Sequence, residues 1–384
     1  MLHALEEEIG TALGNGSRAG VEDGLPCEKT RFPSREAGAD MIRVKKLTLQ
    51  DEARWDRFVD DAEAGTLFHR TAWKRIIEAT FEYRSHYLFA MRNEEICGVL
   101  PLFHVRSWFA GNAVISTPFA VYGGLLAQDE EVEQALLNAG EAFASEQGAD
   151  YLELRQRFAC RNEELQTREN LYCTFIKPIY TLPEQTFSEL PREARRMVRK
   201  AEKFGLTARF DNLRLPEFYD IYANSVRSLG TPVFPTALFE HCLREFKDEA
   251  DVLLIFHEDR PVAGVLSFYY RDTVLPYYGG SLPTQNHLAP NNFMYWSLMK
   301  SAGERGYKFF DFGRSKNSTG AFHFKRHMGF EQIPLPYQYR MMNGAQLPNN
   351  NPTNPKFQLA IKLWQRMPLG LTKVLGPRLV RQFP

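Results

Sequence analysis

EEICGVLPLFHV (94–105) and DRPVAGVLSFYY (259–270) are two stretches of this chain that share a pattern, a charged turn followed by a mostly apolar run around Gly-Val-Leu. Such a turn and run are typical of a β-hairpin whose second strand is largely buried. Because the two stretches lie about 165 residues apart in a chain of 384, they raise the question of how much else is repeated.

Three further pairs of segments repeat in the same order, each separated by about 160 residues. The pairs are VYGGLLAQ (121–128) with PYYGGSLP (276–283), an expected helix over 129–147 with one over 291–304, and YLELR (151–155) with KFFDFGR (308–314). Glycines end both helices, at Gly148 and near Gly306. Hairpins and glycine-terminated helices occur in many α/β proteins, but four matches in register favour a duplicated domain.

The predicted fold class is α/β (α+β), with two tandem domains that each contain a mixed, twisted sheet flanked by helices. The length of 384 residues also exceeds the roughly 250–300 that one hydrophobic core serves. The predicted divisions are a disordered tail (1–40), a first domain (41–170), a second domain (171–345), and a linker with a basic amphipathic segment (346–384). The tail is rich in Gly, Glu, Arg and Ser and lacks hydrophobic periodicity; a start at Met41 is the alternative.

The overall composition indicates a cytoplasmic protein. Lys+Arg and Asp+Glu both number 47, so any contact with nucleic acid or membrane must come from local patches, and no DNA partner is expected. The five cysteines are odd in number and form no CxxC pair, which argues against a disulfide framework or a zinc ribbon. The sequence contains no run of eighteen apolar residues and no basic-then-apolar signal peptide at its start.

The stretch DFGRSKNSTGAFHFKRHMGF (311–330) opens with the Asp-Phe-Gly of protein kinases, but a kinase is excluded. A kinase also needs a Gly-rich phosphate loop and an HRD loop, whereas no GxGxxG occurs and His69-Arg70 is followed by Thr71. We therefore interpret DFG as the end of a buried strand. This places Asp311 and Arg314 at the carboxyl edge of a sheet, where α/β folds hold their working groups.

Two local patterns and the repeat together resemble a known family. One pattern is the basic helix REARRMVRKAEKFGL (192–206), and the other is DFGR followed by a glycine-containing loop and FKRHMGF (324–330). Tandem halves with these patterns are similar to the FemAB (FemABX) family, whose two domains are GNAT-like and which is also classed with BioF2-like acyltransferases. The likeness spans about 41–340, and it is greatest to members associated with exosortase/PEP-CTERM systems in bacteria that make exopolysaccharide.

The resemblance implies an enzyme, an N-acyltransferase that moves an aminoacyl or other acyl group to an amine of a cell-envelope or exopolysaccharide-related precursor. Ordinary GNAT enzymes hold coenzyme A in an Arg/Gln-x-x-Gly-x-Gly/Ala loop at a helix N-terminus, and neither half contains this spacing. We therefore favour aminoacyl-tRNA over acyl-CoA as the donor and expect no bound cofactor. The alternatives are an acyl-CoA-dependent GNAT enzyme and a non-catalytic module that binds a nucleotide-linked envelope component.

The predicted catalytic residues are Lys325, Asp311 and Arg314. The resemblance places a functional lysine at the Phe-Lys position, where an ammonium group can stabilise developing negative charge; the alternative is a solvated helix lysine. On the first interpretation, Lys325→Ala loses about 3 kcal/mol of transition-state stabilisation and only about 0.5 kcal/mol of folding stability. Asp311 is expected to orient Arg314 or accept the amine proton, or else to be a structural acid at the strand end.

The predicted substrate-binding residues lie in the same stretch, in the basic helix and in the second YGG. They are Lys316, Phe324, Arg195, Arg196, Arg199 and Tyr278. The arginines recur at helical spacing and form a positive stripe that can follow RNA phosphates, although a solvated helix face has the same pattern. His323 and His327 are four apart, but the Glu of HExxH is missing, so no metal is predicted.

The C-terminal segment follows a linker, NNNPTNP (349–355), and is basic throughout. Residues 356–384 contain six Lys and Arg residues, no acidic residue, and apolar positions between them. Such a segment can lie on an anionic membrane surface, giving peripheral contact at the inner membrane, or pack against its own protein. We favour packing against its own protein.

Overall fold

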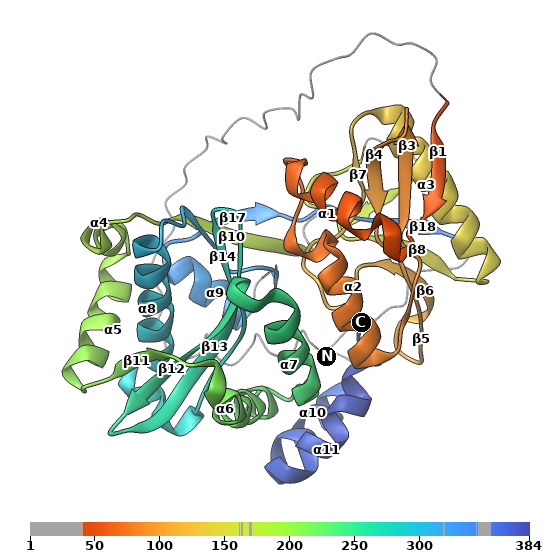
Figure 1. Ribbon diagram of the computed structural model, residues 1–384. Coiled ribbons are helices and arrows are strands. Elements are labelled where there is room, and N and C mark those ends of the chain that lie inside the picture. Colours follow the sequence, from red (N-terminus) through yellow and green to blue (C-terminus); the bar gives the residue numbers. More distant parts are fainter. Residues whose placement is uncertain are drawn as a thin grey trace.

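The computed structural model describes residues 41–160, 162, 164–168, 171–317, 319–342, 344 and 355–384. The predicted tail (1–40) and residues 349–354 of the predicted linker (349–355) lie outside the described residues, and Pro355 begins a helix. Figure 1 shows two lobes that follow one another along the chain, with two helices of the C-terminal segment packed beside the second.

The first lobe contains two sheets and three helices in its described residues, ordered as the sequence predicts. Its elements are β1 (Arg43–Lys46), α1 (Glu52–Asp61), α2 (Thr71–Phe81), β2 (Arg84–Ser85), β3 (Leu88–Arg92), β4 (Glu95–Leu100), β5 (Phe103–Ser107), β6 (Gly111–Ser116), β7 (Leu126–Ala127), α3 (Glu130–Glu146), β8 (Tyr151–Leu154) and β9 (Gln166–Arg168). One sheet has the order β1-β3-β4-β7 and the other β2-β5-β6-β8-β18-β9, in which β18 (Tyr337–Met341) comes from far along the chain.

The second lobe is built on one long sheet with the order β11-β12-β13-β14-β15-β10-β16, and β17 pairs with β10 beside it. Its elements are β10 (Tyr172–Pro178), α4 (Pro183–Ser188), α5 (Arg192–Lys203), β11 (Thr207–Phe210), α6 (Leu215–Ser228), α7 (Thr236–Phe246), β12 (Ala250–His257), β13 (Arg260–Tyr270), β14 (Thr273–Ser281), α8 (Pro290–Glu304), β15 (Phe309–Asp311), β16 (Ser315–Lys316), α9 (Gly320–His327), β17 (Glu331–Pro334) and β18 (Tyr337–Met341). Helices α5 and α8 cover one face of this sheet, and α6 and α7 cover the other (Figure 1).

A proline explains why the repeated apolar run is one continuous strand, β13, in the second lobe but is divided into β4 and β5 in the first. Pro101 follows the shared Gly-Val-Leu and separates β4 from β5, because proline supplies no N–H to a ladder. At the matching place in the second lobe Ser267 keeps its N–H, and the eleven-residue β13 passes through a register shift between Leu266 and Ser267 without breaking. The repeat therefore predicted the order of strands, but not the division of the first sheet.

One strand, β18, crosses from the second lobe back to the first. Strand β10, which follows the first lobe in the sequence, pairs antiparallel with β15 of the second lobe (Ile176 opposite Asp311). Strand β18 returns to the first lobe and pairs antiparallel with β8 (Gln338 opposite Leu154). The predicted division at 345 assigns β18 to the second domain by sequence, whereas its hydrogen bonds belong to a sheet of the first.

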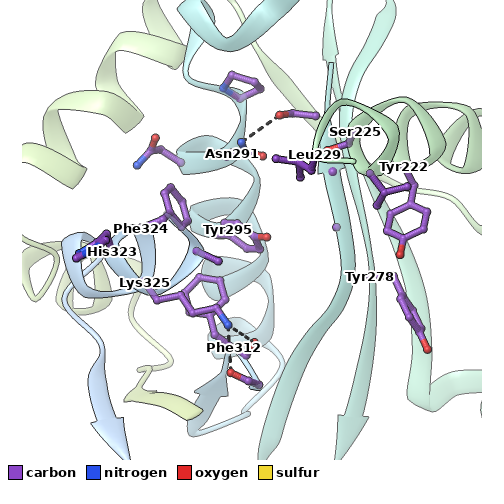
Figure 2. A pocket seen from close by; sticks show the side chains of 18 of the residues that line it. Tyr222, Ser225, Leu229, Tyr278, Asn291, Tyr295, Phe312, His323, Phe324 and Lys325 are labelled. Carbon is purple, nitrogen blue, oxygen red and sulfur yellow. Dashed lines mark hydrogen bonds between the residues drawn. The ribbon is translucent and has the colours of Figure 1, made fainter. Parts of the chain in front are cut away.

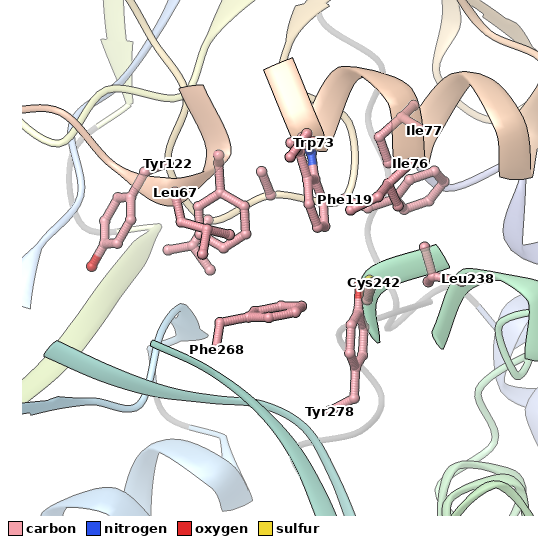
Figure 3. Packing of buried hydrophobic residues seen from close by; sticks show 14 of the residues in the cluster. Leu67, Trp73, Ile76, Ile77, Phe119, Tyr122, Leu238, Cys242, Phe268 and Tyr278 are labelled. Carbon is pink, nitrogen blue, oxygen red and sulfur yellow. The ribbon is translucent and has the colours of Figure 1, made fainter. Parts of the chain in front are cut away.

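A shared hydrophobic core also joins the lobes. Figure 3 shows side chains of α2 and of the 117–125 segment facing side chains of α7, β13 and β14; its labels include Trp73, Ile76, Ile77, Phe119, Leu238, Cys242, Phe268 and Tyr278. Trp73 is fully buried, and its ring centroid lies 6.3 Å from that of Phe268. Burial of these large rings favours a fixed arrangement of the two lobes, since apolar area removed from water is the main stabilising contribution to such contacts.

Candidate functional site

A gap between two neighbouring strands of the second lobe forms the candidate site. Strands β14 and β15 run parallel and pair only at Thr273–Phe309 and Val274–Phe310. Beyond Val274 they diverge, because β15 ends at Asp311 and is held on its other side by β10. A cavity of about 800 Å³ lies in this gap, with β14 on one side and the 312–314 segment on the other.

The walls of the cavity come from both lobes. Helix α9 supplies Phe324 and Lys325, and Ser225 of α6 and Leu229, which follows that helix, lie across the cavity (Figure 2). The first lobe contributes Phe119 and Val121 through the segment that follows β6. The cavity is therefore lined by rings and aliphatic groups toward the first lobe, and a bound molecule there would contact both lobes.

Two glycines of the repeated YGG allow the helices on both faces to approach β14. A Cβ at Gly279 would lie 3.1 Å from the Tyr295 hydroxyl on α8, and one at Gly280 would lie 2.7 Å from the Ser225 Cβ on α6. The corresponding position in the first lobe is filled, because a Cβ at Gly124 would lie 2.0 Å from Gln156 Oε1. In both repeats the glycines therefore let a neighbouring side chain approach the backbone, Gln156 in the first lobe and Tyr295 and Ser225 in the second.

The rim of the cavity carries positive charge and a helix N-terminus. Arg196 and Lys200 of α5 line it together with Lys316, and so does Glu193, whose carboxylate accepts two hydrogen bonds from Arg196. Helix α8 begins at Pro290 beside the cavity, and its N-cap residue Ala289 provides no side-chain hydrogen bond to the helix end. Free N–H groups and the helix dipole favour a negatively charged group at such an end.

Lys325 is buried, so the interpretation as a solvated helix lysine is wrong. Only 8% of the residue is exposed, and its ammonium group donates to the carbonyl oxygens of Phe312 (3.1 Å), Gly313 (3.1 Å) and Arg314 (3.3 Å). It also donates to the Ser315 hydroxyl oxygen (2.7 Å). These contacts fix the segment between β15 and β16, and the expectation of a surface-like loss of about 0.5 kcal/mol is corrected accordingly.

Asp311 is a buried acid whose oxygens are occupied. It accepts hydrogen bonds from the Thr174 hydroxyl (2.7 Å), the Gly313 N–H (2.8 Å) and, from the first lobe, the Tyr122 hydroxyl (2.8 Å). Burial is the leading reason that the pKa of Tyr122 lies well above its usual value, so this phenol stays a donor. Asp311 is not among the described residues that line the cavity, and the structural alternative fits it better than acceptance of the amine proton.

Arg314 lines the cavity but is oriented by aromatic rings instead of by Asp311. Its guanidinium carbon lies 4.7 Å from the ring centroid of Tyr172 and 5.8 Å from that of Tyr337. It donates to the Tyr337 hydroxyl oxygen at 3.4 Å, and that hydroxyl donates in turn to the Val121 carbonyl oxygen. Stacking of this kind holds an arginine in place while leaving donors of its planar fork free for an anion.

The remaining predicted residues divide between the cavity and its surroundings. Lys316, Phe324 and Arg196 line the cavity. Tyr278 also lines it, but the ring of Tyr278 packs in the shared core and its hydroxyl oxygen is buried without a hydrogen-bond partner.

The other two arginines of the predicted stripe lie off the cavity. Arg195 donates to the Ser188 carbonyl oxygen, and the guanidinium of Arg199 stacks over the Phe187 ring. Helix α5 packs on the sheet by the face that carries Ala194, Val198 and Ala201. The orientation of this buried face determines which basic side chains of the helix reach the cavity.

Sequence analysis missed the polar groups at the start of α8. Asn286, Asn291 and Asn292 line the cavity, and Asn291 donates to the Ser281 hydroxyl oxygen at 3.0 Å. Tyr295, one turn further on, also lines it, and burial raises the pKa of Tyr295 to about 12. The proline of HLAPNNF (287–293) is a sequence signal for a helix start, which a search for glycine-rich loops passes over.

Comparison with known proteins supports an acyltransferase. Residues 188–326 match the family model described as an acetyltransferase (GNAT) domain. This stretch includes the cavity residues of α5, α6, β14 and α8, and those of α9 except His327. No curated protein matches the chain.

Solved structures show the same fold over most of the chain. FemX is 16% identical, with a TM-score of 0.64, over 83% of this chain and 100% of that one. The C-terminal domain of a putative lysylphosphatidylglycerol synthetase from Agrobacterium fabrum is 14% identical, with a TM-score of 0.53, over 77% and 93%. A tandem GNAT protein from the clavulanic acid biosynthesis pathway is 8% identical, with a TM-score of 0.51, over 78% and 98%. The fold is therefore that of tandem GNAT proteins.

None of the helices in the described residues is long and apolar enough to span a membrane. The His, Cys, Asp and Glu side chains in the described part of the chain form no group of three that could hold a metal ion.

Proposed function

We propose that the protein is an N-acyltransferase of FemAB type that works in the cavity between β14 and β15. The observation that carries the proposal is the divergence of these strands inside the matched GNAT domain, which creates a cavity with a cationic rim. The acceptor would be an amine of a cell-envelope or exopolysaccharide-related precursor. The sequence patterns quoted above support the exosortase/PEP-CTERM-associated subgroup of the family.

The cavity can supply the contacts that acyl transfer needs. The reaction forms a C–N bond, breaks the ester or thioester bond of the donor, and passes the amine proton to a base or to the leaving group. As the amine attacks the acyl carbon, negative charge develops on the carbonyl oxygen, and main-chain N–H groups of β14 beyond Val274, which have no β15 partner, would face this oxyanion. His323 lines the cavity and is our candidate for the group that takes the proton.

Phosphates of the donor would lie at the rim, beside Arg196, Lys200 and the N-terminus of α8. We favour charged tRNA, because the loop with which GNAT enzymes hold coenzyme A has no counterpart in the sequence. One observation favours acyl-CoA as a second candidate: the N-terminus of α8 opens on the cavity without a side-chain cap. Arg314 and Lys325 would position the 312–316 segment against the acyl group.

Filter binding of a labelled aminoacyl-tRNA pool at near-physiological salt separates the two donors. We expect retention of charged over uncharged tRNA, with little displacement by acetyl-CoA or long-chain acyl-CoA. Arg196→Glu/Lys200→Glu, which alters the rim, should weaken binding about 100-fold, as loss of phosphate contacts does. The matched variant Arg195→Glu/Arg199→Glu makes the same charge change off the rim and should weaken binding less. Equal losses in both variants, or displacement of the RNA by acyl-CoA, would count against a tRNA donor.

A further inference from the structure

The C-terminal helices pack against the protein by one face each. Helices α10 (Pro355–Arg366) and α11 (Leu369–Val380) both lie against α6. Trp364 is buried, and its indole N–H donates to the Thr231 carbonyl oxygen at 3.0 Å. Lys373 pairs with Asp220 of α6. The expectation that this segment packs against its own protein agrees with these contacts.

The opposite faces of the two helices combine exposed apolar and basic side chains. The apolar ones are Leu359 (61% exposed), Leu363 (55%), Leu371 (46%) and Val374 (63%). They recur at spacings of four and three residues, so each pair lies on one side of its helix. Exposed basic side chains, Lys362, Arg366 and Arg378, lie among them, and the segment 355–384 contains no acidic residue. We call these seven residues the outer face.

We propose that the outer face docks on the surface of a bilayer that contains anionic lipid. Apolar side chains of a surface helix enter the boundary between head groups and acyl chains, while lysine and arginine bind anionic head groups. Both requirements are met by the same short segment. Its packing against α6 does not oppose membrane binding, because packing uses the buried face and leaves the outer face uncovered by described residues.

The positive charge of the outer face favours an anionic bilayer over a second copy of the chain as the partner that binds there. A second copy of the chain would bring two faces of the same positive sign together, which is unfavourable. An anionic surface is complementary to all three exposed cations at once.

Docking would place the candidate site near the lipid. Helix α6 contacts both C-terminal helices and lines the cavity with Ser225 and Ser228. A molecule that is anchored in the bilayer, or that partitions into it, would then reach the cavity by a short path. This inference concerns where the protein works, and it stands whether or not the cavity proves to be an acyl-transfer site.

Vesicle co-sedimentation of the full chain tests the docking surface directly. Vesicles are made from phosphatidylcholine alone or from phosphatidylcholine mixed with phosphatidylglycerol. We expect the protein to sediment with the mixed vesicles at low salt and to be released as salt rises, since charge supplies part of the attraction. Equal binding to both vesicles, or no binding to either, would overturn the proposal.

Matched variants locate the surface. Leu363→Asp/Val374→Asp places carboxylates on the outer face and should reduce vesicle binding at least about tenfold. Leu213→Asp is the control, because Leu213 is 92% exposed and lies outside this segment. Thermal unfolding of each variant shows whether a loss of vesicle binding comes from misfolding. If the double aspartate variant is misfolded, Lys362→Gln/Arg378→Gln is tested in its place. Equal losses in the control and the test variant, or a wild-type dimer that the aspartates dissociate in light scattering, would show that the outer face is not a lipid surface.

Discussion

Replacing Lys325 by methionine should destabilise the protein strongly, because removing this buried ammonium group leaves several hydrogen-bond acceptors without their donor. Three carbonyl oxygens and one hydroxyl oxygen accept hydrogen bonds from this side chain, and 8% of the residue is exposed. A hydrogen bond to a charged group contributes about 1.5–3 kcal/mol. The ammonium group has three protons for four acceptors, and the cavity gives water access to some of them. We therefore expect a loss of about 3–4 kcal/mol in the free energy of unfolding.

Urea unfolding followed by fluorescence and by circular dichroism measures this loss. Arg326→Met is the matched control, because Arg326 follows on the same helix and is exposed, and it should change the free energy of unfolding by about 0.5 kcal/mol or less. Activity should fall in Lys325→Met even where the protein remains folded, since the segment that carries Arg314 loses its anchor. A Lys325→Met protein within about 1 kcal/mol of the wild type would refute the assignment of Lys325 as the residue that holds this segment.

Three further predictions follow from burial and packing. Burial lowers the pKa of His69 to about 4, so between pH 6.5 and 4 the unfolded chain binds more protons than the folded protein. The free energy of unfolding should therefore fall by up to about 3 kcal/mol as pH drops through this window. In urea unfolding curves measured over a series of pH values, His69→Gln should make this fall smaller. Trp364→Ala should cost about 3–5 kcal/mol in differential scanning calorimetry, whereas Leu363→Ala, at an exposed position, should cost little; equal losses would contradict the packing described for α10. Gly280→Ala should push α6 from β14 and weaken donor binding in the filter assay, while Gly370→Ala, whose Cβ meets nothing within 4 Å, should not; unchanged donor binding in both would remove Gly280 from the site.

The sequence predicted the fold from local patterns, and it failed where pairing is decided by tertiary structure. The repeated hairpins, helices and strand ends indicated two similar halves, and tandem GNAT structures share this fold. The return of β18 to a sheet of the first lobe could not be predicted, because an isolated strand pattern does not say which sheet the strand joins. Pro101 was visible as a ladder breaker, and it could have predicted the split between β4 and β5.

The sequence indicated which segment lines the cavity better than it indicated what the individual side chains there do. The stretch 311–330 does reach the cavity, through Arg314, Lys316, Phe324 and Lys325. Burial changes what Lys325 and its neighbours do, and burial depends on how β15 and α9 pack, which spacing alone does not reveal. The spacing of Ala194, Val198 and Ala201 could have shown the buried face of α5, and with it which cations remain near the cavity.

Photo-crosslinking of the donor tests the central claim most directly, namely that acyl transfer takes place between β14 and β15. Two probes would be used in parallel, an aminoacyl-tRNA and an acyl-CoA, each with a diazirine on the acyl group, followed by peptide mapping by mass spectrometry. We predict that one of them labels 277–281, 312–316 or 321–325 and that the unmodified donor prevents the labelling. Specific labelling confined to the first lobe, 41–160, would contradict this placement of the site.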